Sequence, residues 1–429
     1  MNISVIGTGY VGLVTGTVFA DLGHKVYCVD IDESKIEKLI QGEIPFFEPG
    51  LQELVKKNLS QGRLFFTTSY EESVPNSKVV FVCVGTPPKE NGEPNLTYLY
   101  DASESVAKHL KDYTLIAIKS TVPIGVEKEL ETLIKKNSSA EFEFASCPEF
   151  LREGSAVEDT KTPDRIVIGT NSRKAADILL KLYENFNGQR IICDLTSAQM
   201  TKYAANSLLA TKISFANAIA NLCESTGADV EMVLKGVGLD KRLGRAFLYP
   251  GVGYGGSCFP KDISAFIKIA EKYDIDFKLL KAVEEINNDQ PKKFFNKVES
   301  ELGDLKDKTI AVLGLAFKAN TDDIREAPSV KIIEMLLKNG AIIKVYDPEA
   351  MENVRKIYGD KIQYEESPYK AVEDASAFLL ITEWNEFREL DLVEVKKLMK
   401  QAIIFDGRNI YDPLEVKELG FIYHGIGRA

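Results

Sequence analysis

The chain has 429 residues, of which 45% are hydrophobic and 27% are charged, and its formal net charge is -11. This length predicts a globular protein of two or three domains. The acidic balance argues against a nucleic-acid partner and an anionic membrane surface, because both attract clustered basic residues. The first residues lead directly into a strand, and no apolar run approaches ~20 residues, so we expect neither a signal peptide nor a membrane span.

The cysteines indicate the redox compartment. Six of them are scattered along the chain, and none forms a C-x-x-C pair. This pattern is typical of a reduced cytoplasm and of a protein without metal, rather than of a disulfide framework or a zinc site. We therefore expect a cytoplasmic protein that holds no metal ion.

The N-terminal segment predicts a dinucleotide-binding turn. A strand at residues 3–6 leads into GTGYVG at residues 7–12, followed by a helix and a second strand that ends at Asp30. In such a turn, glycine allows the chain reversal, the approach of a pyrophosphate and close helix packing, and the phosphates bind the helix N-terminus. A carboxylate at Asp30 accepts hydrogen bonds from the adenosine ribose and repels a 2′-phosphate. The segment therefore predicts NAD rather than NADP.

Three further apolar runs, at residues 79–84, 115–118 and 142–145, end in polar loops. Ligands of open α/β sheets lie over the carboxyl ends of the strands, where we expect these loops. This makes Thr86, Thr121, Glu149 and Glu153 candidate contacts. Taken singly, the threonines suit ordinary turn chemistry, and the glutamates suit a solvated helix face. Their expected convergence at one sheet edge favours a functional interpretation.

Residues 197–226 predict a long, alanine-rich helix without proline, which Gly227 terminates. It is too long for a crossover and indicates a spine between domains, with faces that suit either a partner subunit or an internal core. Lys202 and Asn206 lie four residues apart near its start, on one face. By spacing alone, this pair fits an exposed polar stripe equally well.

The last third repeats the pattern of strand, turn, helix and strand. The second strand ends at Asp347, but the turn keeps a single glycine, Gly314, 33 residues before that acid, against 23 residues between Gly7 and Asp30. We therefore predict a second Rossmann-like unit that is not a second dinucleotide site. Three cations near its strand ends fit either a pyrophosphate or ordinary surface charge: Lys318, Arg325 and Arg408.

The segment PGVGYGGSCFPKD, residues 250–262, combines four glycines with a thiol and an acid. A glycine cluster lets backbone approach a ligand, although a lone Gly-Gly-x-Cys is more often a turn with an inert cysteine. None of the three histidines lies in a glycine loop or at a strand end, so the usual imidazole base of a dehydrogenase is missing. A thiolate offers another route: it attacks a carbonyl, the thiohemiacetal gives up a hydride, and water releases the thioester as an acid.

Such chemistry needs charged neighbours. Cations such as Lys261 or Lys202 would lower the thiol pKa from about 8.5 and stabilise each oxyanion. Acids such as Asp262 or Glu149 would steer water and accept protons.

Seven motifs occur in order over nearly the whole chain: GTGYVG, VGTPP, KSTVP, CPEFLREGSA, the Lys202/Asn206 pair, GYGGSCFPKD and GLAFKANTDDIRE. Together they resemble the UDP-glucose 6-dehydrogenases of the UDP-glucose/GDP-mannose dehydrogenase family, and GGSCFPKD is highly specific. The resemblance implies two NAD-dependent oxidations that convert the C6 alcohol of UDP-glucose, through a bound aldehyde and a cysteine thioester, to UDP-glucuronate. It also implies a homodimer formed through the long helix.

The resemblance assigns roles to individual residues. Cys258 is the nucleophile, Lys202 and Asn206 stabilise the oxyanion, and Asp262, Glu149 and Thr121 handle protons and water. The cofactor-binding residues are Gly7, Gly9, Tyr10, Val11, Gly12, Asp30, Lys35, Thr86, Thr121, Glu153, Lys261 and Arg325. The substrate-binding residues are Glu149, Phe150, Leu151, Arg152, Glu153, Lys202, Asn206, Arg242, Phe247, Leu248, Tyr249, Pro250, Gly251, Gly255, Lys318 and Arg408, with Arg242 reaching the site of the neighbouring subunit.

We therefore expect an α/β protein with two Rossmann-like doubly wound domains joined by a long central helix. The expected parts are an NAD-binding domain at 1–196, a central helical dimerisation region with the cysteine loop at 197–300, and a UDP-sugar-binding domain at 301–429. Alternatives are the same chemistry on UDP-N-acetylmannosamine or GDP-mannose, a two-electron hydroxyacid dehydrogenase, and a catalytically silent nucleotide-binding regulator. The motif SCFP favours the glucose enzyme. A hydroxyacid dehydrogenase would have no use for Cys258, and the intact set of Cys258, Lys202 and Asp262 argues against a silent regulator.

Overall fold

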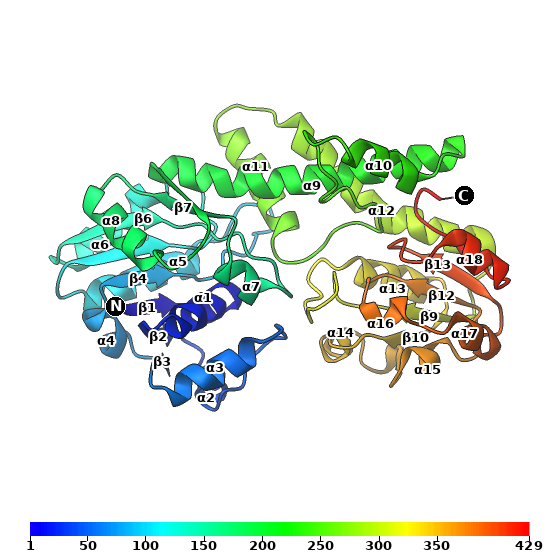
Figure 1. The fold of residues 1–429 in the computed structure, drawn as a ribbon, viewed down its shortest axis with the longest axis horizontal. Helices are drawn as coiled ribbons and strands as arrows, with labels where there is room; N and C mark the ends of the chain where they lie inside the picture. Colours follow the sequence, from blue (N-terminus) through cyan, green and yellow to red (C-terminus); the bar gives the residue numbers. More distant parts are fainter. Residues whose placement is uncertain (429) are drawn as a thin grey trace. The chain divides into compact units, whose positions relative to one another are not determined.

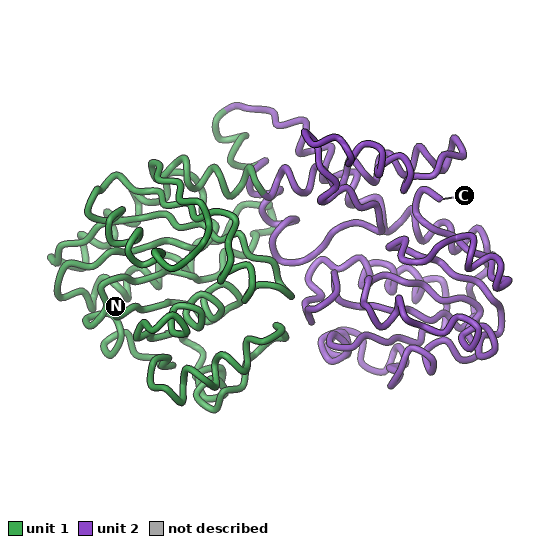
Figure 2. Tube along the Cα trace, in the orientation of Figure 1, with its two compact units in different colours: residues 1–205, 268–273 green, residues 206–267, 274–429 purple. Residues whose placement is uncertain are grey.

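The computed structural model describes residues 1–428 and divides them into two compact units (Figure 2). Unit 1 comprises residues 1–205 and 268–273, and unit 2 comprises residues 206–267 and those from Asp274 onward. The long helix α9 (Leu195–Thr226) begins in unit 1 and ends in unit 2. The three-part division at residues 196 and 300 that the sequence suggests stays a prediction.

Unit 1 is built on an eight-stranded sheet with the order β3-β2-β1-β4-β5-β6-β7-β8 (Figure 1). All neighbours pair in parallel except β6 and β7, which meet through one antiparallel pair, Ser146 and Gly169. The order of the first six strands is that of the Rossmann fold. The strands are β1 (Asn2–Ile6), β2 (Lys25–Val29), β3 (Leu64–Thr67), β4 (Val79–Val82), β5 (Thr114–Ile118), β6 (Phe142–Ser146), β7 (Arg165–Gly169) and β8 (Gln189–Cys193).

Helices cover both faces of this sheet. Successive residues of a strand point to opposite faces, and in β4 both sets are apolar and buried, so each face packs on its own layer of helices. Val79 and Phe81 of β4 belong to a core with α1, α3 and α8, whereas Val80 and Val82 belong to a core with α5 and α6. The helices are α1 (Tyr10–Asp21), α2 (Glu33–Ile40), α3 (Leu51–Ser60), α4 (Tyr70–Ser73), η1 (Val74–Asn76), α5 (Thr97–His109), α6 (Glu127–Asn137), α7 (Ala156–Lys161) and α8 (Arg173–Leu182).

Unit 2 repeats this design with a six-stranded, all-parallel sheet of order β11-β10-β9-β12-β13-β14. Counted from its own first strand, this is the order of the first six strands of unit 1. The two sheets and α9 confirm the fold class expected from the sequence. The strands are β9 (Thr309–Leu313), β10 (Ile342–Tyr346), β11 (Gln363–Tyr364), β12 (Ala377–Leu380), β13 (Ile403–Asp406) and β14 (Ile422–His424).

One face of the second sheet packs on α12, α13 and the later turns of α9, and the other face packs on α15 to α18. The last residues of α11 belong to unit 1. The helices are α10 (Val230–Gly238), α11 (Phe259–Lys272), α12 (Lys278–Leu302), α13 (Pro328–Lys338), α14 (Met351–Tyr358), η2 (Gly359–Lys361), α15 (Pro368–Val372), α16 (Asn385–Arg388), α17 (Leu392–Leu398) and α18 (Pro413–Glu418).

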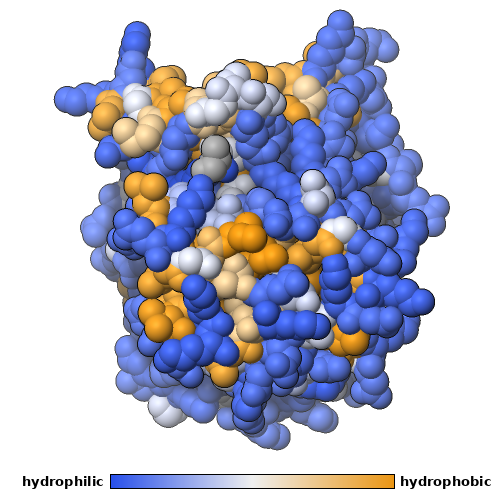
Figure 3. Space-filling view, turned by 90° about the vertical axis from the view of Figure 1, so that its right-hand side faces the viewer, coloured by the Kyte–Doolittle hydropathy of each residue, from blue (hydrophilic) through white to orange (hydrophobic). Residues whose placement is uncertain are grey.

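Polar and charged side chains cover most of the face of unit 2 drawn in Figure 3, and apolar side chains gather there in a few separate places. Among residues 1–428, no helix combines the length and the apolar character that a membrane span requires.

Candidate active site

The dinucleotide turn of unit 1 connects β1 to α1, and its glycines are required by geometry. Gly7 has φ +95°, and a Cβ there would lie 2.9 Å from the carbonyl oxygen of Cys83. A Cβ on Gly12 would overlap the carbonyl oxygen of Gly7. Gly9 precedes α1 with open space around it and with no side chain capping the helix. The uncapped N–H groups of α1 are thus available to an anion such as a pyrophosphate.

Asp30 lies directly after β2 and beside this turn. Its Oδ2 accepts hydrogen bonds from the backbone N–H and the hydroxyl of Thr8, at 2.9 and 2.6 Å, and from Lys35 Nζ at 3.0 Å. Burial opposes ionisation, but the bonds from Thr8 and Lys35 outweigh it and lower the pKa of Asp30. An ionised carboxylate at the end of β2 fits the ribose hydroxyls of NAD, so turn and acid together suit that cofactor.

The loops after β4 and β5 meet at their threonines. Thr86 Oγ1 donates a hydrogen bond to the carbonyl oxygen of Thr121 at 2.9 Å. The structure therefore brings together these two predicted residues, which follow neighbouring strands of the sheet.

Lys202 and Glu149 form a buried ion pair in unit 1. Lys202 Nζ donates to Glu149 Oε1 at 2.7 Å, and the two side chains are only 5% and 6% exposed. Glu149 Oε2 also accepts the backbone N–H of Leu151 at 2.8 Å. A pair in this environment is held without competition from water, so it places a cation and a carboxylate at fixed positions.

The rest of the loop after β6 has varied partners. The ring of Phe150 lies 4.0 Å from the Arg165 guanidinium carbon, and Arg152 binds both carboxylate oxygens of Asp159. Glu153 is buried.

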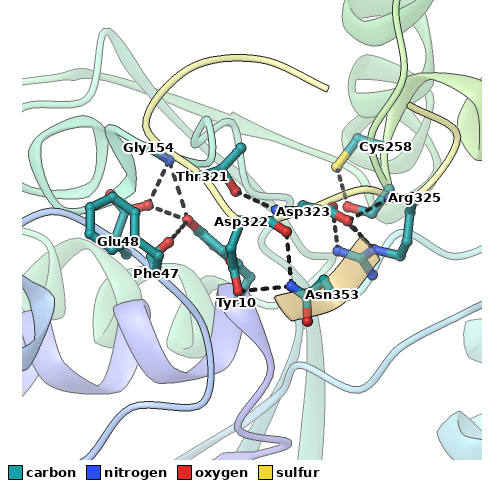
Figure 4. Close-up of polar contacts among 11 residues, drawn as sticks. Tyr10, Phe47, Glu48, Gly154, Cys258, Thr321, Asp322, Asp323, Arg325 and Asn353 are labelled. Carbon is teal, nitrogen blue, oxygen red and sulfur yellow. Dashed lines mark hydrogen bonds and ion pairs between the residues drawn. The ribbon is translucent and has the colours of Figure 1, made fainter. Parts of the chain in front are cut away.

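Glu48 anchors this loop to the dinucleotide turn, and sequence reasoning missed it. Its carboxylate accepts the backbone N–H groups of Gly154 and Ala156, each at 2.6 Å, and the hydroxyl of Tyr10 (Figure 4). Burial and then the bond to Glu48 raise the pKa of Tyr10 far above its usual value, so the hydroxyl remains a donor. A glutamate before Pro-Gly carries no signal of this role, because the two backbone N–H groups that it binds are over 100 residues away in sequence.

Residues 250–258 of unit 2, which we call the nucleophile loop after the role predicted for Cys258, are held by residues from outside the loop. Asn217 Oδ1 accepts the N–H of Gly251 at 2.8 Å, and Arg408 donates to the carbonyl of Gly253 at 3.2 Å. Two backbone bonds add to these, from Val252 to Gly407 at 3.1 Å and from Gly256 to Arg325 at 2.8 Å. Asn287 contributes two further bonds, both to Tyr254.

Glycine is required where other parts of unit 2 approach this loop closely. A Cβ on Gly255 would overlap the carbonyl oxygen of Glu326. Gly256 has φ +83°, and a Cβ there would lie 2.8 Å from the ring of Phe317. The double glycine before Ser257 therefore has a steric explanation within unit 2.

Cys258 lies immediately before α11, and its thiol is partly exposed. Ser257 Oγ lies 3.5 Å from the sulfur. A thiol at a helix N-terminus is biased toward the thiolate, because the helix dipole favours negative charge there. In the first turn of α11, Asp262 is 1% exposed and accepts hydrogen bonds from Asn206 Nδ2, at 2.6 Å, and from Lys261.

The other cysteines differ from Cys258. Burial raises the pKa of Cys83 and of Cys147 to about 12, and it raises the pKa of Cys28 as well. None of the six cysteines, all within residues 1–428, forms a disulfide, and only Cys193 shares the partial exposure of Cys258. Buried neutral thiols are poor nucleophiles. Burial also raises the pKa of Cys193, which ends a strand, whereas Cys258 directly precedes a helix.

Several predicted site residues of unit 2 are engaged by local partners. Arg325 binds both oxygens of Asp323, as Figure 4 shows, and Arg242 binds those of Asp240. Arg408 also donates to the carbonyls of Ile381 and Phe317.

The remaining predicted residues of unit 2 differ in conformation and exposure. Lys318 Nζ lies 5.5 Å from the ring centroid of Phe317. Phe247 has φ +65°, which is rare outside glycine, so the segment before the nucleophile loop is strained. Leu248 and Pro250 are buried, whereas Tyr249 is 57% exposed.

In the second Rossmann-like unit, the acid at the end of the second strand is buried and bound by neighbouring groups of the same unit. Asp347, after β10, is fully buried and accepts the N–H groups of Leu315 and Ala316 and the indole N–H of Trp384. Its other oxygen, Oδ1, accepts the backbone N–H groups of Glu349 and Ala350. This carboxylate has no face left for a ribose, which agrees with the prediction that this unit is not a dinucleotide site.

The uncapped glycine turn, the ionised acid after β2 and the doubly wound sheet define a dinucleotide-binding unit that suits NAD. Family models agree. The chain matches the NAD binding domain of the UDP-glucose/GDP-mannose dehydrogenase family at residues 1–187, the central domain at 196–289 and the UDP binding domain at 311–413. The chain belongs to the UDP-glucose/GDP-mannose dehydrogenase family, whose substrates are nucleotide sugars.

Individual relatives span the full chain. UDP-glucose 6-dehydrogenase TuaD of Bacillus subtilis is 49% identical over all of this chain and 93% of its own length. The solved UDP-glucose dehydrogenase of Pyrobaculum islandicum is 39% identical with a TM-score of 0.94, and covers 100% of this chain and 98% of its own. A UDP-D-ManNAc dehydrogenase from Pyrococcus horikoshii is 31% identical, with a TM-score of 0.87 and coverage of 100% and 99%.

Proposed function

We propose that the protein oxidises UDP-glucose to UDP-glucuronate with two equivalents of NAD through a thioester on Cys258. The observation that carries the mechanism is the partly exposed thiol at the start of α11, four residues before a buried carboxylate with an amide and an ammonium partner. The identity to enzymes named UDP-glucose 6-dehydrogenase supports the choice of sugar.

The first oxidation turns the C6 alcohol into an aldehyde. Bound NAD supplies the hydride acceptor in both oxidations. Glu149 or Asp262, directly or through a held water, accepts the hydroxyl proton as the carbonyl forms. The ammonium of Lys202, fixed by its 2.7 Å bond to Glu149, favours the negative charge that develops on this oxygen.

The second oxidation requires the thiol. Sγ of Cys258 adds as a thiolate to the aldehyde carbon, and the resulting oxyanion is stabilised by Lys202 and by the second amide hydrogen of Asn206. Loss of a hydride gives a thioester, and water steered by Asp262 displaces the thiolate. One alcohol, one water and two NAD⁺ thus give one carboxylate, two NADH and three protons.

The stoichiometry of NADH tests this mechanism. Purified protein with limiting UDP-glucose and excess NAD is expected to form about two NADH per sugar, followed by absorbance and by chromatography of the sugar nucleotide. A yield of one, or aldehyde accumulating in solution, would contradict the four-electron reaction. UDP-N-acetylmannosamine and GDP-mannose serve as alternative substrates, and faster turnover of either would reassign the sugar.

We further propose a homodimer formed through α9. Leu208, Phe215 and Leu222 recur about every seven residues on this helix and are 63%, 49% and 59% exposed, a pattern typical of helix pairing. Phe215→Glu is expected to shift the protein to monomer in sedimentation velocity, because it places a charge in an apolar contact. Leu414→Glu, on the exposed face of α18, is the control, and an unchanged dimer in Phe215→Glu would reject this interface.

A cytoplasmic location is also proposed, because none of the six cysteines, all within residues 1–428, forms a disulfide. Fractionation of cells that produce the protein tests it, and recovery from an oxidising compartment would contradict it.

We also propose that the chain has domain boundaries at residues 196 and 300. Limited proteolysis tests this proposal.

A further inference from the structure

A single asparagine of α12 binds both backbone polar groups of one residue in the nucleophile loop. Asn287 Oδ1 accepts the N–H of Tyr254 at 2.8 Å, and Asn287 Nδ2 donates to the carbonyl oxygen of Tyr254 at 3.0 Å. The asparagine is only 7% exposed. Because a side-chain amide offers one acceptor and one donor group in a fixed plane, this double contact sets the orientation of the Tyr254 backbone.

The loop fits closely against this side chain. Gly253 has φ +101°, and a Cβ there would lie 3.1 Å from Asn287 Oδ1. Asn217 binds Gly251 and Arg408 binds Gly253, so among these three side chains Asn287 binds the residue that lies nearest to Cys258 along the sequence.

An aromatic contact connects Tyr254 to the residue that follows the thiol. The rings of Tyr254 and Phe259 meet edge to face, with centroids 5.7 Å apart and an interplanar angle of 88°. Phe259 is bonded to Cys258 and begins α11. A shift of the Tyr254 backbone therefore reaches Cys258 both along the loop and through the Phe259 ring.

We propose that Asn287 is a positioning residue that places Cys258 for attack on the aldehyde. This rests on the proposed role of Cys258 as the nucleophile. Asn287 acts through Tyr254 and touches neither substrate nor cofactor in this scheme. Because the first oxidation does not use the thiol, misplacement of Cys258 affects the second oxidation selectively, and the aldehyde then has time to escape. Misplacement of a reacting group by about 1 Å lowers a rate by roughly 10²-fold.

The experiment compares Asn287→Ala with Asn288→Ala. Asn288 is the next residue on the same helix, but it is exposed, which makes it a matched control. NADH per UDP-glucose consumed is measured with and without semicarbazide, which traps free aldehyde. We expect two NADH and no trapped aldehyde for the wild-type and Asn288→Ala proteins. Asn287→Ala is expected to give between one and two NADH, trapped aldehyde, and acid formation slowed by roughly 10²-fold, with the KM for NAD unchanged.

Asn287→Asp keeps the experiment decisive if the alanine variant does not fold, as judged by thermal unfolding. The aspartate has nearly the same size and still accepts from Tyr254, but its carboxylate cannot donate to the Tyr254 carbonyl. We expect the same incomplete oxidation. Two NADH per sugar and no trapped aldehyde from the folded variants would overturn the positioning role. A purely structural role would slow both oxidations equally and would not release the aldehyde between them. A wild-type yield of one would instead overturn the cysteine mechanism.

Discussion

Replacement of Cys258 by alanine is expected to lower formation of the acid by at least about 10³-fold, because no other group on α11 provides a nucleophile at this position. The thiol lies at the start of a helix and outside the buried cores, so its loss creates no cavity in either sheet packing. The thermal unfolding temperature should therefore remain within a few degrees of the wild type. NAD binding, measured by calorimetry, should persist because the glycine turn and Asp30 are intact.

Cys193→Ala is the matched control for this variant. Cys193 is the other partly exposed cysteine, and it ends β8 rather than beginning a helix. It should keep full activity. Acid formation by Cys258→Ala at more than one tenth of the wild-type rate would remove the thiol from the mechanism.

Replacement of Lys202 by methionine is expected to have two separable effects. In the proposed mechanism the reaction loses a cation that faces developing negative charge, which is expected to lower kcat by roughly 10²–10³-fold. The protein also loses the partner of Glu149, a carboxylate 6% exposed, and leaving a buried charge unpaired destabilises a fold by about 3–5 kcal/mol. Activity and the free energy of unfolding should therefore both fall.

A second substitution separates these effects. In Lys202→Met/Glu149→Gln the buried charge is gone, so most of the stability should return in chemical denaturation while kcat remains low. Lys135→Met breaks the exposed pair with Glu131 and should change neither quantity. Recovery of kcat in the double variant would show that Lys202 serves stability rather than the reaction.

The architecture could be predicted from the sequence because its signals are local. The glycine spacing at residues 7–12, the acid at the end of the next strand, and apolar runs ended by loops each reflect a constraint within about 30 residues. The spacing between Gly314 and Asp347 is wider than that between Gly7 and Asp30, and it predicted that the second unit is not a dinucleotide site. The structure supplies the physical reason, since Asp347 is used entirely by its own turn and by Trp384.

The supports of the site could not be predicted in the same way, because they act at long range. Glu48 binds a loop more than 100 residues away, and Asn217 accepts from a glycine 34 residues further along. One signal was present for Asn287. It shares the buried side of α12 with Val283 and Phe294, and a polar residue on an apolar stripe usually has a specific partner. Its partner, however, depends on tertiary structure.

The nucleophile loop also bears on how such chains are recognised as enzymes. Its glycines leave it few side chains with which to fix its own conformation. The side chains that fix it are Asn217 on α9, Asn287 on α12 and Arg408 after β13. A homologue that retains every letter from Pro250 to Asp262 but has lost these distant polar residues would still match the motif while its thiol was out of place. Annotation of activity in this family should therefore score the residues that hold the motif together with the motif itself.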